Sequence, residues 1–199
     1  MIDKVLTMNG CSARSKIAVK SLITVCIIAL GVALPQVFHI VLGQEGGAVY
    51  LPMYLPVLLG ACLLGARYGA AMGIMSPLVS FVVTSLAGEA MPALGRLPFM
   101  MFELLVFGVV AGLFATGIAR RSYLAFAAVI SAQILGRGSF IIASWLLSGV
   151  SSVAPSMAVN QVTAGWPGLL IQIVAVPAIV MILGRVIKDS ADDRSETRV

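Results

Sequence analysis

The run LPFMMFELLVFGVVAGLFATG occupies residues 97–117, and it is apolar along nearly its whole length yet contains one carboxylate, Glu103. A helix of this length rises roughly 30 Å, which is the thickness of the hydrocarbon core of a bilayer. Because a carboxylate that faces lipid is costly, we expect Glu103 to point into a helix bundle or a water-filled cavity and to have polar partners there. This stretch therefore predicts a membrane-spanning helix, and it makes Glu103 the first candidate for a functional residue.

The rest of the chain has the same apolar character. Hydrophobic residues make up 60% of the 199 residues and charged residues only 11%, whereas soluble domains contain about 25% charged residues. The hydrophobic runs leave no room for a soluble catalytic or nucleotide-binding domain. We therefore expect an all-α membrane protein with a single membrane domain.

Apolar segments of membrane-spanning length recur along the chain. Six are expected, at about residues 17–34, 51–66, 68–86, 97–117, 123–147 and 166–187. Lys and Arg residues gather at alternate ends of these segments, so the positive-inside rule predicts that both chain ends are cytoplasmic. The expected organisation is a cytoplasmic segment at 1–16, a six-helix bundle at 17–187 and a cytoplasmic tail at 188–199. The net charge of +5 is explained by this anchoring, and nucleic-acid binding is not expected.

Glycine and proline mark the connections and contacts between these segments. Pro35 is expected to kink or end the first helix, and we expect a glycine-rich turn at 43–50 and outer loops at 87–96 and 148–165. Pro52 and Pro56 free backbone groups that need polar partners, so the start of the second segment is expected to border a cavity. Gly69 and Gly73 form a GxxxG face that permits close helix contact.

Polar side chains within the membrane segments gather in their outer halves. With this topology, Glu103 lies about 8 Å and Gln172 about 9 Å inward from the outer ends of their helices, and Arg137 lies roughly 15 Å inward. Such an arrangement is typical of an outward-opening cavity that captures a small solute. It does not suit a continuous pore, which needs polar lining along its whole path. The predicted substrate-binding residues are Glu103, Arg137, Gln133, Asn160, Gln172, Trp166 and His39, with Gln161 also at the outer rim.

Each predicted residue also has a structural interpretation. Glu103 and Arg137 either neutralise each other or contact a ligand, and the tilt of helical side chains toward their own N-termini slightly disfavours direct pairing across antiparallel helices. Gln172 is equally suited to a hydrogen bond between helices. His39 and Trp166 are typical of membrane interfaces, and Asn160 is suited to cap the sixth helix.

Sequence motifs give little support to an enzyme. The single histidine excludes an HExxH zinc site, and neither a GxSxG nucleophile turn nor a GxxxxGK[ST] phosphate loop occurs. The three cysteines lack metal-ligand spacing, so no metal and no cofactor are predicted. If transport is active, its energy must come from another subunit.

Two stretches carry a resemblance to a known family. Residues 51–80, LPMYLPVLLGACLLGARYGAAMGIMSPLVS, contain a proline-bracketed second helix and a Gly-Pro-rich third helix, and residues 97–114, LPFMMFELLVFGVVAGLF, follow the pattern P-x-M-x-x-E-L-x-x-[YF]-G-x-x-x-G. This combination resembles the substrate-binding S components of energy-coupling factor (ECF) vitamin transporters. The resemblance implies capture of a vitamin or vitamin precursor near the outer face of a prokaryotic cell membrane.

The resemblance also implies partners and an interface. Family members couple to a membrane T component and two cytoplasmic ATPase subunits, and an AxxxA face on the first helix contacts the T component; Ala29 and Ala33 fit this spacing. Arg137 favours a ligand with a carboxylate or phosphate, such as a pantothenate-like acid. If Glu103 neutralises Arg137, the ligand could instead be neutral or cationic.

Two other classes of function compete with this interpretation. A self-sufficient secondary transporter would use Glu103 as a proton or cation site, and internal inverted repeats, of which none is convincing, would favour it. A membrane scaffold or enzyme without transport activity is the other alternative. Of these three classes, we expect the protein to be an S component.

Overall fold

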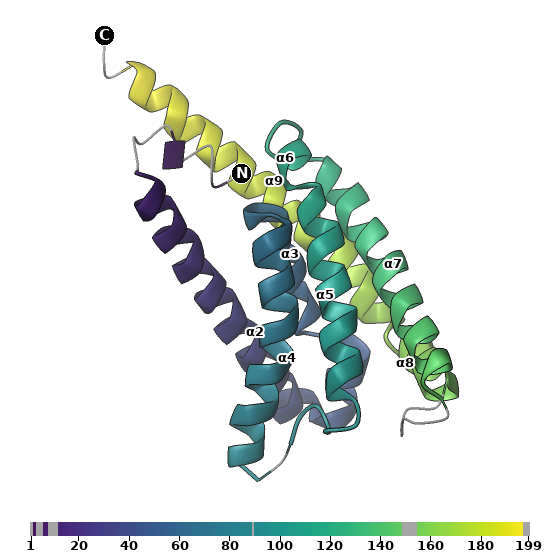
Figure 1. Cartoon of the computed structure of the whole chain (residues 1–199). Coiled ribbons are helices and arrows are strands. Elements are labelled where there is room, and N and C mark those ends of the chain that lie inside the picture. Colours follow the sequence, from purple (N-terminus) through teal and green to yellow (C-terminus); the bar gives the residue numbers. More distant parts are fainter. Residues whose placement is uncertain (1, 3–5, 8–11, 89, 149–154, 197–199) are drawn as a thin grey trace.

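The computed structural model describes residues 2, 6–7, 12–88, 90–148 and 155–196, which form helices joined by turns, without strands (Figure 1). The helices are α2 (Ala13–Tyr50), α3 (Tyr54–Leu64), α4 (Ala66–Leu86), α5 (Leu97–Leu113), α6 (Ala115–Ile118), α7 (Leu124–Leu146), α8 (Pro155–Ala164) and α9 (Trp166–Glu196). Four helical stretches are long and apolar enough to cross a membrane, namely Ala13–Gly43, Ala66–Leu86, Leu124–Leu146 and Trp166–Val186, and two shorter apolar helices, α3 and α5, accompany them. The described chain is thus a helical membrane protein, as predicted, while the six-span topology stays a prediction.

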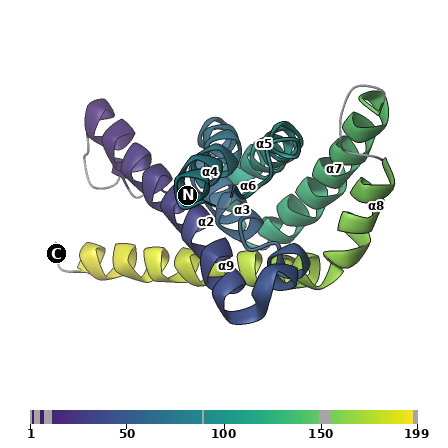
Figure 2. The ribbon, with the colours of Figure 1, turned by 90° about the horizontal axis from the view of Figure 1, so that it is seen from below.

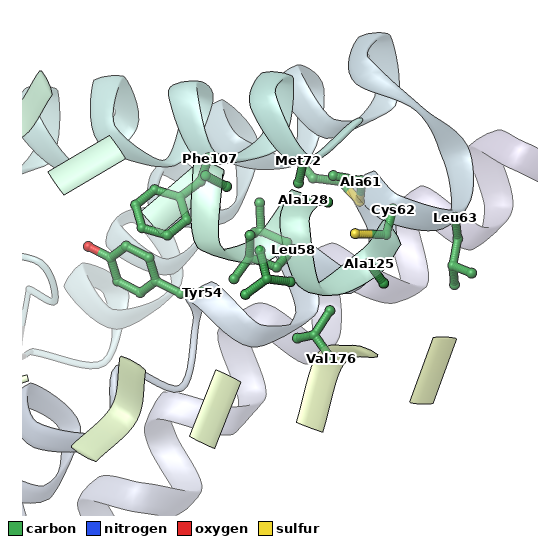
Figure 3. Packing of buried hydrophobic residues seen from close by; sticks show 14 of the residues in the cluster. Tyr54, Leu58, Ala61, Cys62, Leu63, Met72, Phe107, Ala125, Ala128 and Val176 are labelled. Carbon is green, nitrogen blue, oxygen red and sulfur yellow. The ribbon is translucent and has the colours of Figure 1, made fainter. Parts of the chain in front are cut away.

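Helix α3 lies at the centre of the bundle. Its residues Val57, Leu58, Ala61 and Cys62 are fully buried, and it contacts α2, α4, α5, α7 and α9. Figure 3 shows Leu58, Ala61 and Cys62 in one apolar cluster, with Tyr54 and Phe107 side by side at one end of it. The short length of α3 is compatible with this position because its surroundings are protein rather than lipid.

Glycines bring α4 and α5 into backbone contact. A Cβ atom added at Gly69 would collide with the Gly108 carbonyl group, and one added at Gly108 would collide with that of Gly69. Gly73 lies equally close to the Leu104 carbonyl, and Gly112 lies against the start of α4. Two GxxxG faces therefore meet, which confirms the close contact predicted for Gly69 and Gly73.

The outermost helices make fewer contacts with the rest of the protein. Only 22% of the residues in the most apolar part of α2, and likewise in that of α9, are buried inside the bundle. In Figures 1 and 2 the N-terminal part of α2 and the C-terminal part of α9 extend to the same side, away from the group formed by α3, α4 and α5. Exposed large apolar side chains lie on the membrane-length part of each helix, such as Leu22 and Val25 on α2 and Leu170 and Val174 on α9, as expected for helices in contact with lipid or a partner.

The end of the first helix differs from the prediction. Helix α2 continues through Pro35 and is interrupted only at Gly43, which has φ 72° and ψ −177°, before it resumes to Tyr50. The predicted turn at 43–50 is therefore wrong apart from Gly43 itself. Pro35 removes a single backbone donor, and the apolar residues that follow it still favour a helix.

A predicted loop and the predicted tail also contain helix. The predicted loop at 148–165 contains α8, which begins at Pro155, a residue well suited to the first turn of a helix; residues 149–154 lie outside the described residues. In the predicted tail at 188–199, α9 continues to Glu196 because neither glycine nor proline follows Gly184 to end it.

We predict that Gly108→Ala destabilises the protein by about 1–3 kcal/mol, because the added methyl group has to push α4 away from α5. The control is Gly138→Ala on α7, where an added Cβ atom meets nothing within 4 Å. That change is expected to be neutral or to stabilise by up to about 1 kcal/mol, owing to the higher helix propensity of alanine. Thermal unfolding in detergent measures both, and equal effects of the two variants would contradict the proposed packing.

Candidate functional site

A buried ion pair joins α5 to α7. The Arg137 Nη1 atom donates to the Glu103 Oε1 atom at 2.7 Å, and both side chains are buried. The Tyr54 hydroxyl group, at the start of α3, donates to the other carboxylate oxygen at 2.6 Å. Glu103 therefore has the polar partners predicted for it, and three helices meet at one carboxylate.

Direct pairing corrects the slight preference against it that side-chain tilt suggested. That argument considered only the directions in which the two side chains leave antiparallel helices. The observed pair shows that the long arginine side chain spans the resulting offset along the helix axes, because α5 and α7 are neighbours in the bundle. Pairing also relieves the large cost of leaving either charge alone in an apolar interior.

The guanidinium group of Arg137 lies beside two neighbouring aromatic rings. Its Cζ atom is 4.7 Å from the Tyr54 ring centroid and 5.8 Å from that of Phe107, distances typical of cation–π contacts. Gly136 makes room for the Phe107 ring, since a Cβ atom there would overlap it. The Arg137 Nε and Nη2 atoms are buried without a hydrogen-bond partner among the described residues, so the group keeps unused donors.

A second polar network joins α7 to α9. The Gln133 Nε2 atom donates to the Leu169 carbonyl at 3.1 Å and to the Gln172 Oε1 atom at 3.4 Å. The Gln172 Nε2 atom in turn donates to the Leu51 carbonyl at 3.3 Å. Both glutamines are buried. Their contacts are those of hydrogen-bonded connectors between helices.

Both networks end on the segment of residues 51–54, which joins α2 to α3. Gln172 holds the carbonyl of Leu51 at its first residue, and Glu103 holds the hydroxyl group of Tyr54 at its last. Leu51 has φ 49°, an unfavourable conformation for a leucine, so this connection depends on its surroundings to keep its shape. Gly165 packs closely against the Leu51 side chain from the start of α9.

A cavity of about 380 Å³ lies beside this segment, at the end of the bundle where α2, α4, α5 and α8 meet. Its walls are mostly apolar, with a few polar side chains between them. We call it the end cavity, and it is lined by Pro35, His39, Leu51, Pro52, Met53, Tyr54, Ser80, Met91, Pro92, Ala93, Arg96, Met100 and Gln161. The predicted position of the cavity at the start of the second apolar segment agrees with this lining.

Side chains of α4 hold the loop that covers one wall of the end cavity. The Ser80 hydroxyl group donates to the Met91 carbonyl at 3.0 Å. The Thr84 hydroxyl oxygen accepts a hydrogen bond from the Met91 N–H group at 2.8 Å and also lies 3.1 Å from the Met91 carbonyl. Met91 and Pro92 are therefore fixed against α4.

The predicted site residues fall into three groups. Glu103, Arg137, Gln133 and Gln172 form the two buried networks and do not line the end cavity. His39 lines it, together with Gln161, and the His39 Nδ1 atom is buried without a partner among the described residues. Asn160 is exposed on α8, and Trp166 is 60% exposed at the start of α9. The contact of each with a ligand stays a prediction.

Sequence reasoning missed several lining residues. Tyr54, Arg96 and the methionines at 53, 91 and 100 line the end cavity, but none was predicted as a binding residue. The paired prolines around Tyr54 were the available signal for that wall. No group of three or more His, Cys, Asp or Glu side chains suited to a metal ion occurs among the described residues.

The fold defines the class as a helical, multi-pass membrane protein, and the end cavity lies at one end of its bundle. Comparisons of the chain with protein-family models, with curated proteins and with solved structures found no match.

We predict that Arg137→Met alone destabilises the protein by about 3–5 kcal/mol, because it leaves the Glu103 carboxylate buried without its counter-charge. Combining it with Glu103→Leu is expected to restore part of this loss, since no buried charge then remains. Unfolding of the two single variants and the double variant in detergent gives the coupling. Strictly additive losses would show that the ion pair contributes nothing.

Proposed function

We propose that the protein is the S component of an ATP-driven ECF-type importer in a prokaryotic cell membrane, and that it captures a small vitamin or vitamin precursor. The observation that carries this proposal is the end cavity, whose volume of about 380 Å³ lies in the range of small-molecule sites. Hydrogen bonds join its walls to α4, α5 and α9. A preformed cavity of this kind favours binding, because little ordering has to accompany capture of the solute.

The interior next to the end cavity supports a binding protein rather than a pore. Beyond Tyr54, the core of the bundle is filled by apolar side chains of α3, including the fully buried Val57, Leu58 and Ala61. A channel needs polar lining along its path. Below Tyr54 the interior is therefore closed by the paired Glu103 and Arg137 and by packed apolar side chains, and release to the other side would require a movement of the protein.

The competing secondary transporter receives less support. A proton or cation site needs a carboxylate that exchanges with the solute path. Glu103 is fully buried, receives hydrogen bonds from Arg137 and Tyr54, and is absent from the lining of the end cavity. Its charge is already compensated within the protein, so we favour the S component.

The proposed partners are a membrane T component and two cytoplasmic ATPase subunits. Ala29 and Ala33 are both exposed on α2, so an approaching helix would reach them without any rearrangement of the bundle. Small residues allow two helix backbones to come close in a membrane. This exposure is compatible with the interface that the AxxxA spacing predicted.

Mass spectrometry of small molecules released from the gently purified protein tests solute capture. We expect a vitamin-like compound in the wild type and its loss in Met100→Trp, which places a large ring in the end cavity. The control is Phe102→Trp on the same helix, where the side chain is 46% exposed; this variant should retain the compound. Equal amounts in both variants would move the binding site away from the end cavity.

Co-purification with the T component and ATPase subunits tests coupling. We predict that Ala29→Leu and Ala33→Leu reduce the recovered complex several-fold while solute binding by the isolated protein is unchanged. Ala127→Leu serves as control, because it makes the same change at an exposed position on α7. If all three variants recover the same complex, the interface lies elsewhere.

A further inference from the structure

We infer that the ligand of the end cavity is an organic anion with an apolar body, whose acidic group lies between Arg96 and His39. This inference rests on the proposed function, because it specifies the chemistry of the captured solute. It follows from the charge of the cavity lining, the composition of its walls, the unpartnered Nδ1 atom of His39 and the internal pairing of Arg137. Each of these is a separate observation.

The formal charge of the described lining is positive. Arg96 contributes a guanidinium group, and none of the lining residues is a carboxylate. Arg96 is exposed at the start of α5, and its side chain forms no ion pair with another described residue. A concave site with charge of one sign attracts solutes of the opposite sign and raises their rate of association.

His39 has a hydrogen-bonding group that the protein leaves unused. Its Nδ1 atom is buried without a partner among the described residues, although the side chain lines the end cavity. A buried polar atom without a partner is costly, and a ligand that supplies the missing hydrogen bond removes that cost. An imidazole N–H group at this position would donate to an oxygen of the ligand, which an acidic group provides.

The position of Arg137 explains why Arg96 is the better anion contact. The sequence predicted that Arg137 attracts an acidic ligand, but Glu103 already occupies its Nη1 atom at 2.7 Å. Arg137 is also buried beneath Tyr54 and is absent from the cavity lining. The protein has thus neutralised one arginine internally and left the other facing the cavity.

The remaining walls suit an apolar body. Met53, Met91 and Met100 lie around the cavity together with the Tyr54 ring. Methionine side chains are flexible and polarizable, so they adapt to an irregular apolar surface, and a tyrosine ring offers a flat face for stacking. Three prolines complete these walls and lack N–H groups that a ligand would have to satisfy.

The test compares acids with neutral compounds of the same body. Affinities of the full-length protein in detergent are measured for nicotinate and nicotinamide, biotin and biotinamide, and pantothenate and pantothenol, and the compound released from the wild-type protein is identified. In at least one pair the acid should bind about tenfold more tightly. Arg96→Gln should weaken the acid about tenfold and the neutral compound less than about twofold, and added salt should weaken only the acid.

Matched variants separate failure of this inference from failure of the proposed function. Arg67→Gln, an exposed arginine at the opposite end of α4, should leave every affinity unchanged. Three outcomes would overturn the anion assignment while solute binding stands. Neutral compounds bind as tightly as acids, Arg96→Gln weakens both equally, or the released compound has no acidic group. If no probe binds and no compound is released, both the assignment and the proposed function are wrong.

Discussion

The buried carboxylate of Glu103 is the constraint on which the rest of the bundle depends. A single acidic group in an apolar interior must be compensated, and here Arg137 from α7 and Tyr54 from α3 both donate to it. Because hydrogen bonds require a specific geometry, these contacts fix the positions of three helices relative to one another. The same carboxylate orients the Tyr54 ring, which forms a wall of the end cavity. Under the proposed function, the ion pair would therefore act on a ligand through Tyr54, without touching it.

Close packing of glycines makes this constraint possible. Gly69 and Gly108 bring α4 and α5 into backbone contact, and α5 also packs against α3 and α7. In a membrane, where apolar side chains gain little by leaving lipid, such contacts rely on close fit and on polar groups between helices. The glycines supply the fit, while the two buried networks supply the polar contacts. Neither alone would set both the spacing and the register of the helices.

The sequence predicted those features that depend on a single residue type or on a regular spacing along one helix. Apolar runs predicted the helices, the position of Glu103 predicted polar partners, and the spacing of Gly69 and Gly73 predicted a close contact. It did not predict α8, a short helix without a long apolar run, or the choice of cavity residues. Arg96 and Met91 reach the end cavity from a connection without a periodic pattern, so only the packing of distant segments brings them together. The sequence argument slightly disfavoured direct pairing of Arg137 with Glu103, because it considered the tilt of the two side chains and not the length of the arginine side chain.

Helix α2 connects the two surfaces that the proposed function requires. Pro35 and His39 line the end cavity, and Ala29 and Ala33, which are exposed, lie within about three turns of them on the same helix. Gly31 is one of the positions that hold α2 in the bundle, and it packs against Ser76 of α4. A ligand bound to His39 would add a further contact to this helix. Under the proposed function, occupancy of the cavity would therefore restrict the position of the very helix that a membrane partner contacts, which gives solute binding a direct physical route to the partner surface.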